Sequence, residues 1–276
     1  MSTLREQLEA LRGRYDTDQA LTLDPITLPL RYSEPADREV VAWLAASLAY
    51  GRVAPMLRAI EGVLAPLGEH PADTLRSSSE KAILAQLSKA LSEWRWRFHI
   101  GDDAVHWLLA WKRLDASGGL ESHFLPSAGE GPDAALSRLM QRLRKELPST
   151  YGLRFSLPDP AEGSACKRMR MFLRWMVREE WPDLGLWKRY PPSALVIPVD
   201  THVARVARFI RLSTRATPDG RMAQEITAAL RKCDPDDPLK YDFALSHLGI
   251  LGDCPGLRHK VNCRPCPLYA ACRAGR

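Results

Sequence analysis

Apolar residues recur along most of this chain at spacings of three and four residues, which places them on one face of an α-helix. The clearest example runs from Asp37 to Tyr50, where one apolar stripe is formed by Val40, Val41, Leu44, Ala45 and Leu48. Alternation of apolar and polar residues, which is typical of a half-buried strand, is almost absent. The pattern therefore predicts an all-α protein.

The same periodicity predicts where the helices lie. Ser33 and Pro35 predict the start of the helix that precedes Gly51, with a capping residue and a proline in the first turn. The expected helices cover residues 2–14, 33–50, 53–68, 79–92, 102–113, 132–146, 167–180, 199–212, 220–232 and 238–251. Glycine and proline clusters at 117–133 and 157–164 predict loops. We expect residues 1–250 to form a domain of two lobes, with a boundary near 117–131.

A group of cysteines lies near the end of the chain: Cys254, Cys263, Cys266 and Cys272. Their spacing, C-x8-C-x2-C-x5-C, allows one short loop to surround a single metal centre. Structural zinc usually draws on two separated pairs of cysteines, whereas one close pair flanked by single cysteines suits an iron–sulfur cube. We therefore expect residues 251–276 to hold a 4Fe–4S cluster, with zinc as the alternative. Cys166 and Cys233 stand apart and are expected to be ordinary buried side chains.

Positive charge is concentrated in the middle of the chain. The formal net charge is +6, and the sequence pI is about 9.1. Between Ser164 and Lys232 there are fourteen Lys and Arg residues against six Asp and Glu residues, a local surplus of eight. A localised basic stretch is expected of a protein that neutralises phosphates, although helix faces that are merely solvated would give the same count.

The N-terminal residues carry no apolar signal segment, and the longest apolar stretch, residues 40–50, is too short to span a bilayer. We therefore expect a cytoplasmic protein that has no membrane partner. In that reducing compartment, clustered cysteines are expected to bind a metal rather than to form disulfides.

Two residues of the basic stretch are candidates for catalysis. Lys167 follows a turn of small residues, Gly163-Ser-Ala-Cys, at the start of a predicted helix. A lysine near the positive end of a helix and several arginines should lose its proton more easily, which makes the amine nucleophilic. Asp200 follows Pro198 and opens the next helix, so it is also a candidate N-cap. A capping bond would hold its carboxylate in place, and the two roles are compatible.

Together these segments resemble the helix-hairpin-helix DNA glycosylases of the endonuclease III kind. Gly163-Ser-Ala-Cys-Lys167 is similar to the hairpin that ends in the family's catalytic lysine, and Pro198-Val-Asp200-Thr-His-Val is similar to the segment that carries its catalytic aspartate. His247-Leu-Gly-Ile-Leu-Gly-Asp-Cys254 resembles the closing helix and the iron–sulfur loop. The segment that ends in Tyr50-Gly-Arg52 resembles, more weakly, the turn that inserts a side chain into DNA. The resemblance covers most of residues 36–273.

The chain also departs from that pattern. Ala165 stands where the family has a hairpin glycine, and the first gap between cysteines is longer than usual. The interval between Lys167 and Asp200 is longer than in endonuclease III, because it contains the tryptophan-rich segment 181–195. A long interval is similar to that of the archaeal 8-oxoguanine glycosylases. The chain most resembles an uncharacterised bacterial branch of the superfamily.

The resemblance implies a two-lobed glycosylase-like fold and base excision from double-stranded DNA with a damaged base, by a monomer associated with the nucleoid. It implies that Lys167 attacks the sugar and gives the enzyme AP-lyase activity, while Asp200 stabilises the positive charge that develops on the sugar. The expected DNA contacts are Tyr50, Arg52, Gly163, Ser164, Arg168, Arg205, Arg258, Lys260 and Arg264, and Trp181, Trp187 and Tyr190 are weaker candidates for the base pocket.

Some of these residues have simpler interpretations. Tyr50 is equally a packing residue at a helix end, and a tryptophan-rich insertion more often forms a small core of its own. The alternative functions are a non-catalytic nucleic-acid-binding protein that retains the fold and the cluster, and a zinc-stabilised protein that acts on RNA.

Overall fold

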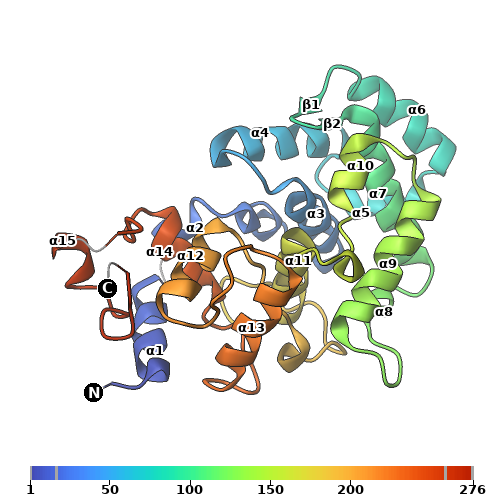
Figure 1. The fold of residues 1–276 in the computed structure, drawn as a ribbon. Helices are drawn as coiled ribbons and strands as arrows, with labels where there is room; N and C mark the ends of the chain where they lie inside the picture. Colours follow the sequence, from blue (N-terminus) through green and yellow to red (C-terminus); the bar gives the residue numbers. More distant parts are fainter. Residues whose placement is uncertain (1, 16–17, 258–259, 275–276) are drawn as a thin grey trace. The chain divides into compact units, whose positions relative to one another are not determined.

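The computed structural model describes residues 2–15, 18–257 and 260–274, and most of these residues are helical. The only sheet in these ranges is a two-stranded antiparallel hairpin. The all-α prediction is therefore confirmed. Figure 1 shows the elements coloured along the chain. None of the helices within the described ranges is long and apolar enough to cross a membrane.

The chain divides into two compact units, each assembled from separate stretches of sequence. Unit 1 comprises residues 1–23, 163–174 and 191–276, and unit 2 comprises residues 24–162 and 175–190. Residues 117–131, where we expected a boundary, lie inside unit 2 and surround the short helix α8 (Leu120–Phe124). Residues 251–276 belong to unit 1. Glycine and proline thus mark a loop within one unit here, and not a linker.

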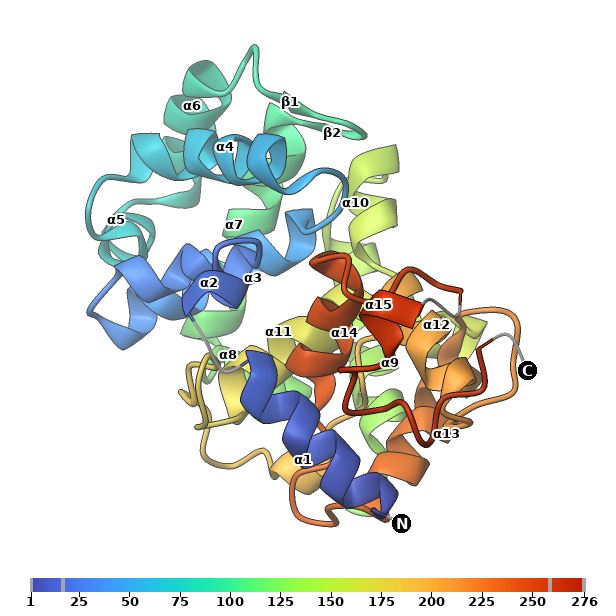
Figure 2. The same ribbon diagram turned by 90° about the vertical axis from the view of Figure 1, so that its left-hand side faces the viewer.

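Unit 1 is built around the buried helix α14. The elements of this unit are α1 (Leu4–Tyr15), α2 (Asp18–Leu21), the first turns of α11 (Lys167–Val177), α12 (Thr201–Phe209), α13 (Gly220–Arg231), α14 (Asp242–Ile250) and α15 (Lys260–Cys263). Helix α14 packs against both α1 and α12, and Figure 2 shows α1 beside it. Apolar side chains such as Phe243, Leu245 and Leu248 are buried, which explains why this helix is apolar around its whole circumference and not along one face.

Unit 2 is built around α3 and α7. Its helices are α3 (Pro35–Leu48), α4 (Val53–Leu64), α5 (Pro71–Ser77), α6 (Glu80–Ala90), α7 (Gly101–Ala116), α8, α9 (Pro132–Glu146) and α10 (Tyr151–Ser156), and its strands are β1 (Arg95–Trp96) and β2 (His99–Ile100). The rings of Trp43 and Trp107 are stacked with centroids 4.4 Å apart. Each indole N–H donates to the backbone carbonyl of the other tryptophan, at 3.0 and 3.3 Å. These bonds satisfy both polar groups inside the core.

The helix boundaries differ from the predicted ones mainly by a few terminal residues. Helix α3 begins at Pro35 as predicted, but its N-cap is Glu34, whose side chain makes no capping bond, so the cap predicted from Ser33 is wrong. Helices α5 and α10 and the hairpin were not predicted. Helix α5 has seven residues, helix α10 has six and each strand has two, so these elements are too short to show a clear period.

Candidate functional site

The loop before α11 is held in one conformation by backbone contacts within unit 1. Gly163 has a φ of +82°, in the region that favours glycine. The Gly220 N–H donates to the Gly163 carbonyl at 2.9 Å, and a Cβ on Gly220 would lie 3.0 Å from the Ser164 carbonyl oxygen. The Cys166 N–H donates to Ser164 Oγ at 3.2 Å. Helix α11 then begins at Lys167, as predicted.

The amine of Lys167 has no partner among the described residues. The side chain is half-buried, and within the described ranges its Nζ makes neither a hydrogen bond nor an ion pair. By contrast, Lys240 of the same unit is paired with both Glu9, at 2.7 Å, and Asp234, at 2.6 Å. The side chain of Lys167 thus differs from that of Lys240 in having no carboxylate partner within the described part of the chain.

Asp200 is the N-cap of α12, which confirms that prediction. Its Oδ1 accepts a hydrogen bond from the Val203 N–H at 2.7 Å. Among the described residues its Oδ2 has no hydrogen-bond partner, and no hydrogen bond or ion pair joins Asp200 to Lys167. The cap therefore holds the carboxylate in place through one oxygen and leaves the other available.

The arginines of α11 do not form the basic surface that the charge count suggested. Arg168 is only 8% exposed, and Arg170, Arg174 and Arg178, which directly follows the helix, are buried still more deeply. Arg174 is paired with Asp242 of α14, and Arg178 with Asp183. The phosphate-binding interpretation is thus wrong for this helix, and the burial of Arg168 does not fit a phosphate contact. Exposed arginines of this stretch lie on other elements, at Arg208, Arg211 and Arg221.

The four clustered cysteines line one small cavity in unit 1. Its volume is about 40 Å³, and its other lining residues are mainly apolar, including Val206, Ile210, Leu248 and Leu268. Burial raises the pKa of the Cys266 thiol, and the neighbouring thiols of Cys254 and Cys272 raise it further. Four thiols around one apolar space suit a tetrathiolate centre. Among the described residues, however, no three metal-binding side chains stand at positions that would already hold an ion.

The cysteine loop is attached to the helices beneath it by polar contacts. Tyr15 Oη donates to Asp253 Oδ2 at 2.5 Å, and Arg14 lies 3.3 Å from the same oxygen. The Ala271 N–H donates to Gln7 Oε1 at 3.1 Å. These bonds join both ends of the loop to α1. Burial raises the pKa of the Tyr15 hydroxyl, and the Asp253 carboxylate raises it further.

Arg205 also holds this loop. Its Nη2 donates to the Cys254 carbonyl at 3.1 Å, and the side chain is half-buried beside Gly256. Arg264, another predicted DNA contact, is exposed. Lys260 begins α15, and Arg258 lies outside the described residues.

In unit 2, the predicted DNA-inserting turn lies between α3 and α4. Gly51 has a φ of +90°, and Arg52 is exposed at the N-terminus of α4. Tyr50 is half-buried, and its hydroxyl lies 2.6 Å from His99 Nδ1. The packing interpretation therefore fits Tyr50, whereas Arg52 remains accessible.

The tryptophan-rich insertion forms part of the unit 2 core. Trp187 is 4% exposed, and its indole N–H donates to Glu39 at 2.7 Å. Burial raises the pKa of the Glu39 carboxyl. Tyr190 is 2% exposed, while Trp181 is 40% exposed. The small-core interpretation therefore fits Trp187 and Tyr190, which do not fit a base pocket.

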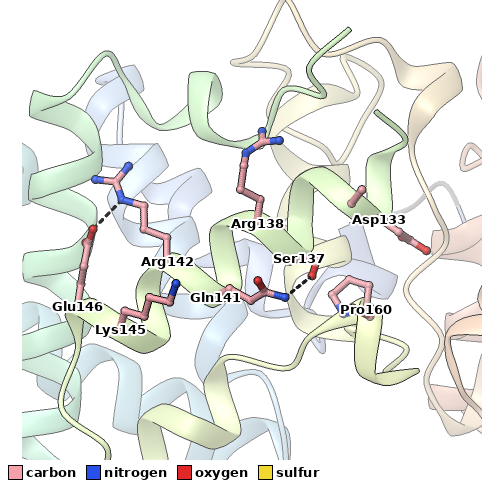
Figure 3. A pocket seen from close by; sticks show the side chains of 10 residues that line it. Asp133, Ser137, Arg138, Gln141, Arg142, Lys145, Glu146 and Pro160 are labelled. Atoms are coloured by element: carbon pink, nitrogen blue, oxygen red, sulfur yellow. Dashed lines mark hydrogen bonds and ion pairs between the residues drawn. The ribbon is translucent and has the colours of Figure 1, made fainter. Parts of the chain in front are cut away.

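A groove of about 710 Å³ runs along α9 in unit 2, and none of the predicted site residues lines it. Figure 3 shows its side chains. Arg142 is paired with Glu146 at 2.7 Å, and Gln141 donates to Ser137 at 3.1 Å and to Asp159 at 3.0 Å. Because these polar groups are bonded to one another, we assign the groove no catalytic role.

A profile described as "Protein of unknown function (DUF2400)" matches residues 24–251. The chain belongs to the DUF2400 family. None of the curated proteins matches it. The matched region contains Lys167 and Asp200, whereas the four clustered cysteines lie beyond its end. Membership of the DUF2400 family therefore leaves the activity to be argued from the residues themselves.

Proposed function

We propose that this protein is a DNA glycosylase with AP-lyase activity, which removes a damaged base from double-stranded DNA. The observation that carries the proposal is that the amine of Lys167, at the start of α11, has no partner among the described residues. Asp200 supports it, because the capping bond orients this carboxylate and leaves Oδ2 unbonded within the described part of the chain. Both residues begin helices of unit 1, α11 and α12.

The two residues divide the reaction between them. Asp200, ionised, stabilises the positive charge that develops on the sugar as the bond between C1′ and the base breaks, with the electron pair leaving on the base. The neutral amine of Lys167 attacks C1′ and forms the Nζ–C1′ bond. The C1′–O4′ bond then breaks, O4′ takes its electron pair and one proton from Nζ, and a protonated Schiff base between Nζ and C1′ remains. Loss of a proton from C2′ then expels the 3′ phosphate with the electron pair of the C3′–O bond, which cuts the strand.

The cysteine loop fits a 4Fe–4S cluster in this proposal. Cys254, Cys263, Cys266 and Cys272 would hold it, since all four line one apolar cavity. When bound, the cluster would join the loop to α12 and α14 and would have a structural role. The bonds that Gln7, Tyr15 and Arg205 make to the loop would then support these ligands from outside.

Borohydride trapping tests the proposal. The full-length protein is incubated with a duplex that contains one abasic site, and borohydride reduces any Schiff base to a stable covalent complex. We expect the wild-type protein to be trapped and Lys167→Ala to give no complex. Lys232→Ala is the control, because Lys232 is an exposed lysine of the same unit at the end of α13.

A normal yield of complex from Lys167→Ala would remove this lysine from the mechanism. Salt-dependent binding to duplex DNA, with neither trapping nor base release from any lesion, would favour the non-catalytic DNA-binding alternative.

A further inference from the structure

Unit 2 exposes a group of aromatic side chains at the tip of its β-hairpin. Phe98, between β1 and β2, is 42% exposed, and Tyr151, at the start of α10, is 68% exposed. Their rings are 5.3 Å apart and nearly perpendicular. Ile100, beside them in β2, is 40% exposed. Neighbouring exposed apolar side chains of this kind mark an interaction surface more often than single ones do. We call Phe98, Tyr151 and Ile100 the hairpin surface.

The hairpin surface is supported by buried and half-buried side chains of unit 2. The Phe98 ring lies 6.1 Å from Tyr50, with the rings almost parallel, and 5.1 Å from Phe155. The imidazole of His99 connects two of the supporting residues, because its Nδ1 lies 2.6 Å from Tyr50 Oη and its Nε2 lies 2.7 Å from Ser156 Oγ. These contacts orient the aromatic planes before any partner binds, which lowers the entropy lost on binding.

A glycine allows α10 to approach the hairpin. A Cβ on Gly152 would lie 2.9 Å from the Phe98 carbonyl oxygen and 2.2 Å from Asp103 Oδ2. Asp103 in turn accepts hydrogen bonds from Thr150 Oγ1 and from the Ile100 N–H. The sequence thus brings Tyr151 and Phe98 together through buried contacts and still leaves both rings exposed.

Positive charge surrounds the hairpin surface. This charge is carried by four exposed side chains, those of Arg52, Arg95, Arg97 and Arg154. Among the described residues none of the four is paired with a carboxylate: Arg95 donates to the carbonyls of Ser92 and Trp94, and Arg154 donates to Ser149. Glu93 and Asp102 are the exposed acidic residues of the segment 93–103. Arg95 and Arg97 are as numerous as these two carboxylates, and the excess of positive charge comes from Arg52 and Arg154, because residues 50–55 and 149–156 contain neither Asp nor Glu.

Arg97 connects the charge to the aromatic rings. Its guanidinium lies 5.9 Å from the centre of the Phe98 ring, and its side chain passes over Gly51, where a Cβ would be 3.3 Å from Arg97 Cδ. The backbone of Arg97 has a φ of +51°, so the hairpin turns sharply at this point. A cation beside an aromatic plane matches the phosphate and the base of one nucleotide.

We propose that the hairpin surface binds unpaired nucleotides of DNA, with bases stacked on Phe98 and Tyr151 and phosphates held by the surrounding arginines. Three observations favour this partner over an apolar peptide or a lipid surface. The aromatic planes are supported from below, the arginines lack carboxylate partners among the described residues, and one guanidinium lies beside a ring. This surface requires DNA as a partner but does not require the excision chemistry of Lys167.

The test measures binding of the full-length protein to a fluorescently labelled single strand of thymidine nucleotides by anisotropy. We expect Tyr151→Ala and Phe98→Ala each to weaken binding about five-fold or more, because a stacked base contributes on this scale. Phe98→Trp should retain the affinity of the wild type. Phe98→Leu, which keeps an apolar side chain but lacks an aromatic plane, should lose it. Tyr151→Ala is the variant least able to disturb folding, since its ring is mostly exposed.

Two results would overturn the proposal. One is unchanged single-strand affinity in both Phe98→Ala and Tyr151→Ala. The other is that Phe98→Ala and Tyr151→Ala keep the DNA affinity of the wild type but no longer bind phosphatidylserine vesicles, which would identify a lipid surface as the partner. Lys167→Ala should bind the single strand as the wild type does. A failed borohydride trap with intact single-strand binding therefore counts against the excision chemistry alone, whereas the opposite pair of results counts against the hairpin surface alone.

Discussion

Asp200 shows how one side chain can serve the fold and the proposed chemistry at once. Its Oδ1 caps α12, and its Oδ2 has no partner among the described residues. The cap is a local feature that depends on the residues from Asp200 to Val203. Because the two oxygens have separate roles, substitutions can separate stability from activity at this position.

We expect Asp200→Asn to abolish base release while leaving stability and DNA affinity close to those of the wild type. Asparagine caps a helix about as well as aspartate but carries no charge to stabilise the sugar cation. Asp200→Ala should lose base release and also the capping bond, and the lost cap should lower the free energy of unfolding by about 1 kcal/mol. Urea denaturation, a base-release assay and DNA binding measure the three quantities. If Asp200→Asn releases the base normally, the residue is a cap alone.

At the scale of elements, the contact between α12 and α14 depends on a glycine. A Cβ on Gly249 of α14 would lie 2.4 Å from Nδ1 of His202 and 2.7 Å from its Cβ. Gly249 therefore lets the imidazole ring of α12 pack directly against the backbone of α14. The same two helices carry Asp200 and lead into Cys254, so this close approach also sets where the cysteine loop begins.

We expect Gly249→Ala to destabilise the protein by about 1–3 kcal/mol through overpacking, even though alanine favours a helix more than glycine does. Gly13→Ala is the matched control, because Gly13 lies in α1 and a Cβ there meets no atom within 4 Å. That substitution should stabilise the protein by up to about 1 kcal/mol. Urea denaturation of both variants measures the difference. If the double variant with Gly249→Ala and His202→Ala is more stable than Gly249→Ala alone, the clash is confirmed. If Gly249→Ala is as stable as Gly13→Ala, the clash is contradicted.

Helix α11 shows the limit of charge counting. Three arginines of this helix and Arg178 directly after it supply four of the fourteen positive charges of the stretch, yet Arg168, Arg170, Arg174 and Arg178 are all buried. A net charge is a sum over residues, whereas a phosphate-binding surface depends on which of them reach solvent. The partners of two of these arginines, Asp242 and Asp183, are separated from them by 68 and 5 residues.

On the scale of the whole molecule, the C-terminal loop is integrated into unit 1. It contacts α1 through Gln7 and Tyr15 and α12 through Arg205, so residues from both ends of the chain meet there. Metal binding to such a loop contributes to the stability of the unit that carries it, because the ligands are brought together only on folding.

We expect anaerobically purified protein to absorb near about 400 nm and to contain iron and sulfide. Cys266→Ser should remove the band and lower the melting temperature, because the loop would lose one of its four expected ligands. Cys233→Ala is the control, since Cys233 is a buried cysteine of unit 1 that does not line the cavity. A colourless protein with stoichiometric zinc would support the zinc alternative instead.

Features that depend on neighbouring residues could be predicted from the pattern along the chain. Periodicity predicted the long helices, Asp200 was recognised as a cap, and the spacing of four cysteines predicted that they would converge, as they do around one cavity. Each of these follows from residues within a few turns of one another. Short elements such as α5, α10 and the hairpin were missed, because they have too few residues to show a period.

Which side chains are exposed depends on packing between distant segments and became clear from the folded chain. It buried the arginines of α11 and placed Trp187 and Tyr190 in a core, and it exposed Phe98 and Tyr151 beside one another. Phe98 and Tyr151 lie 53 residues apart in the sequence. Burial is the sum of contacts among segments that are distant along the chain, so it cannot be obtained from the local pattern of any one of them.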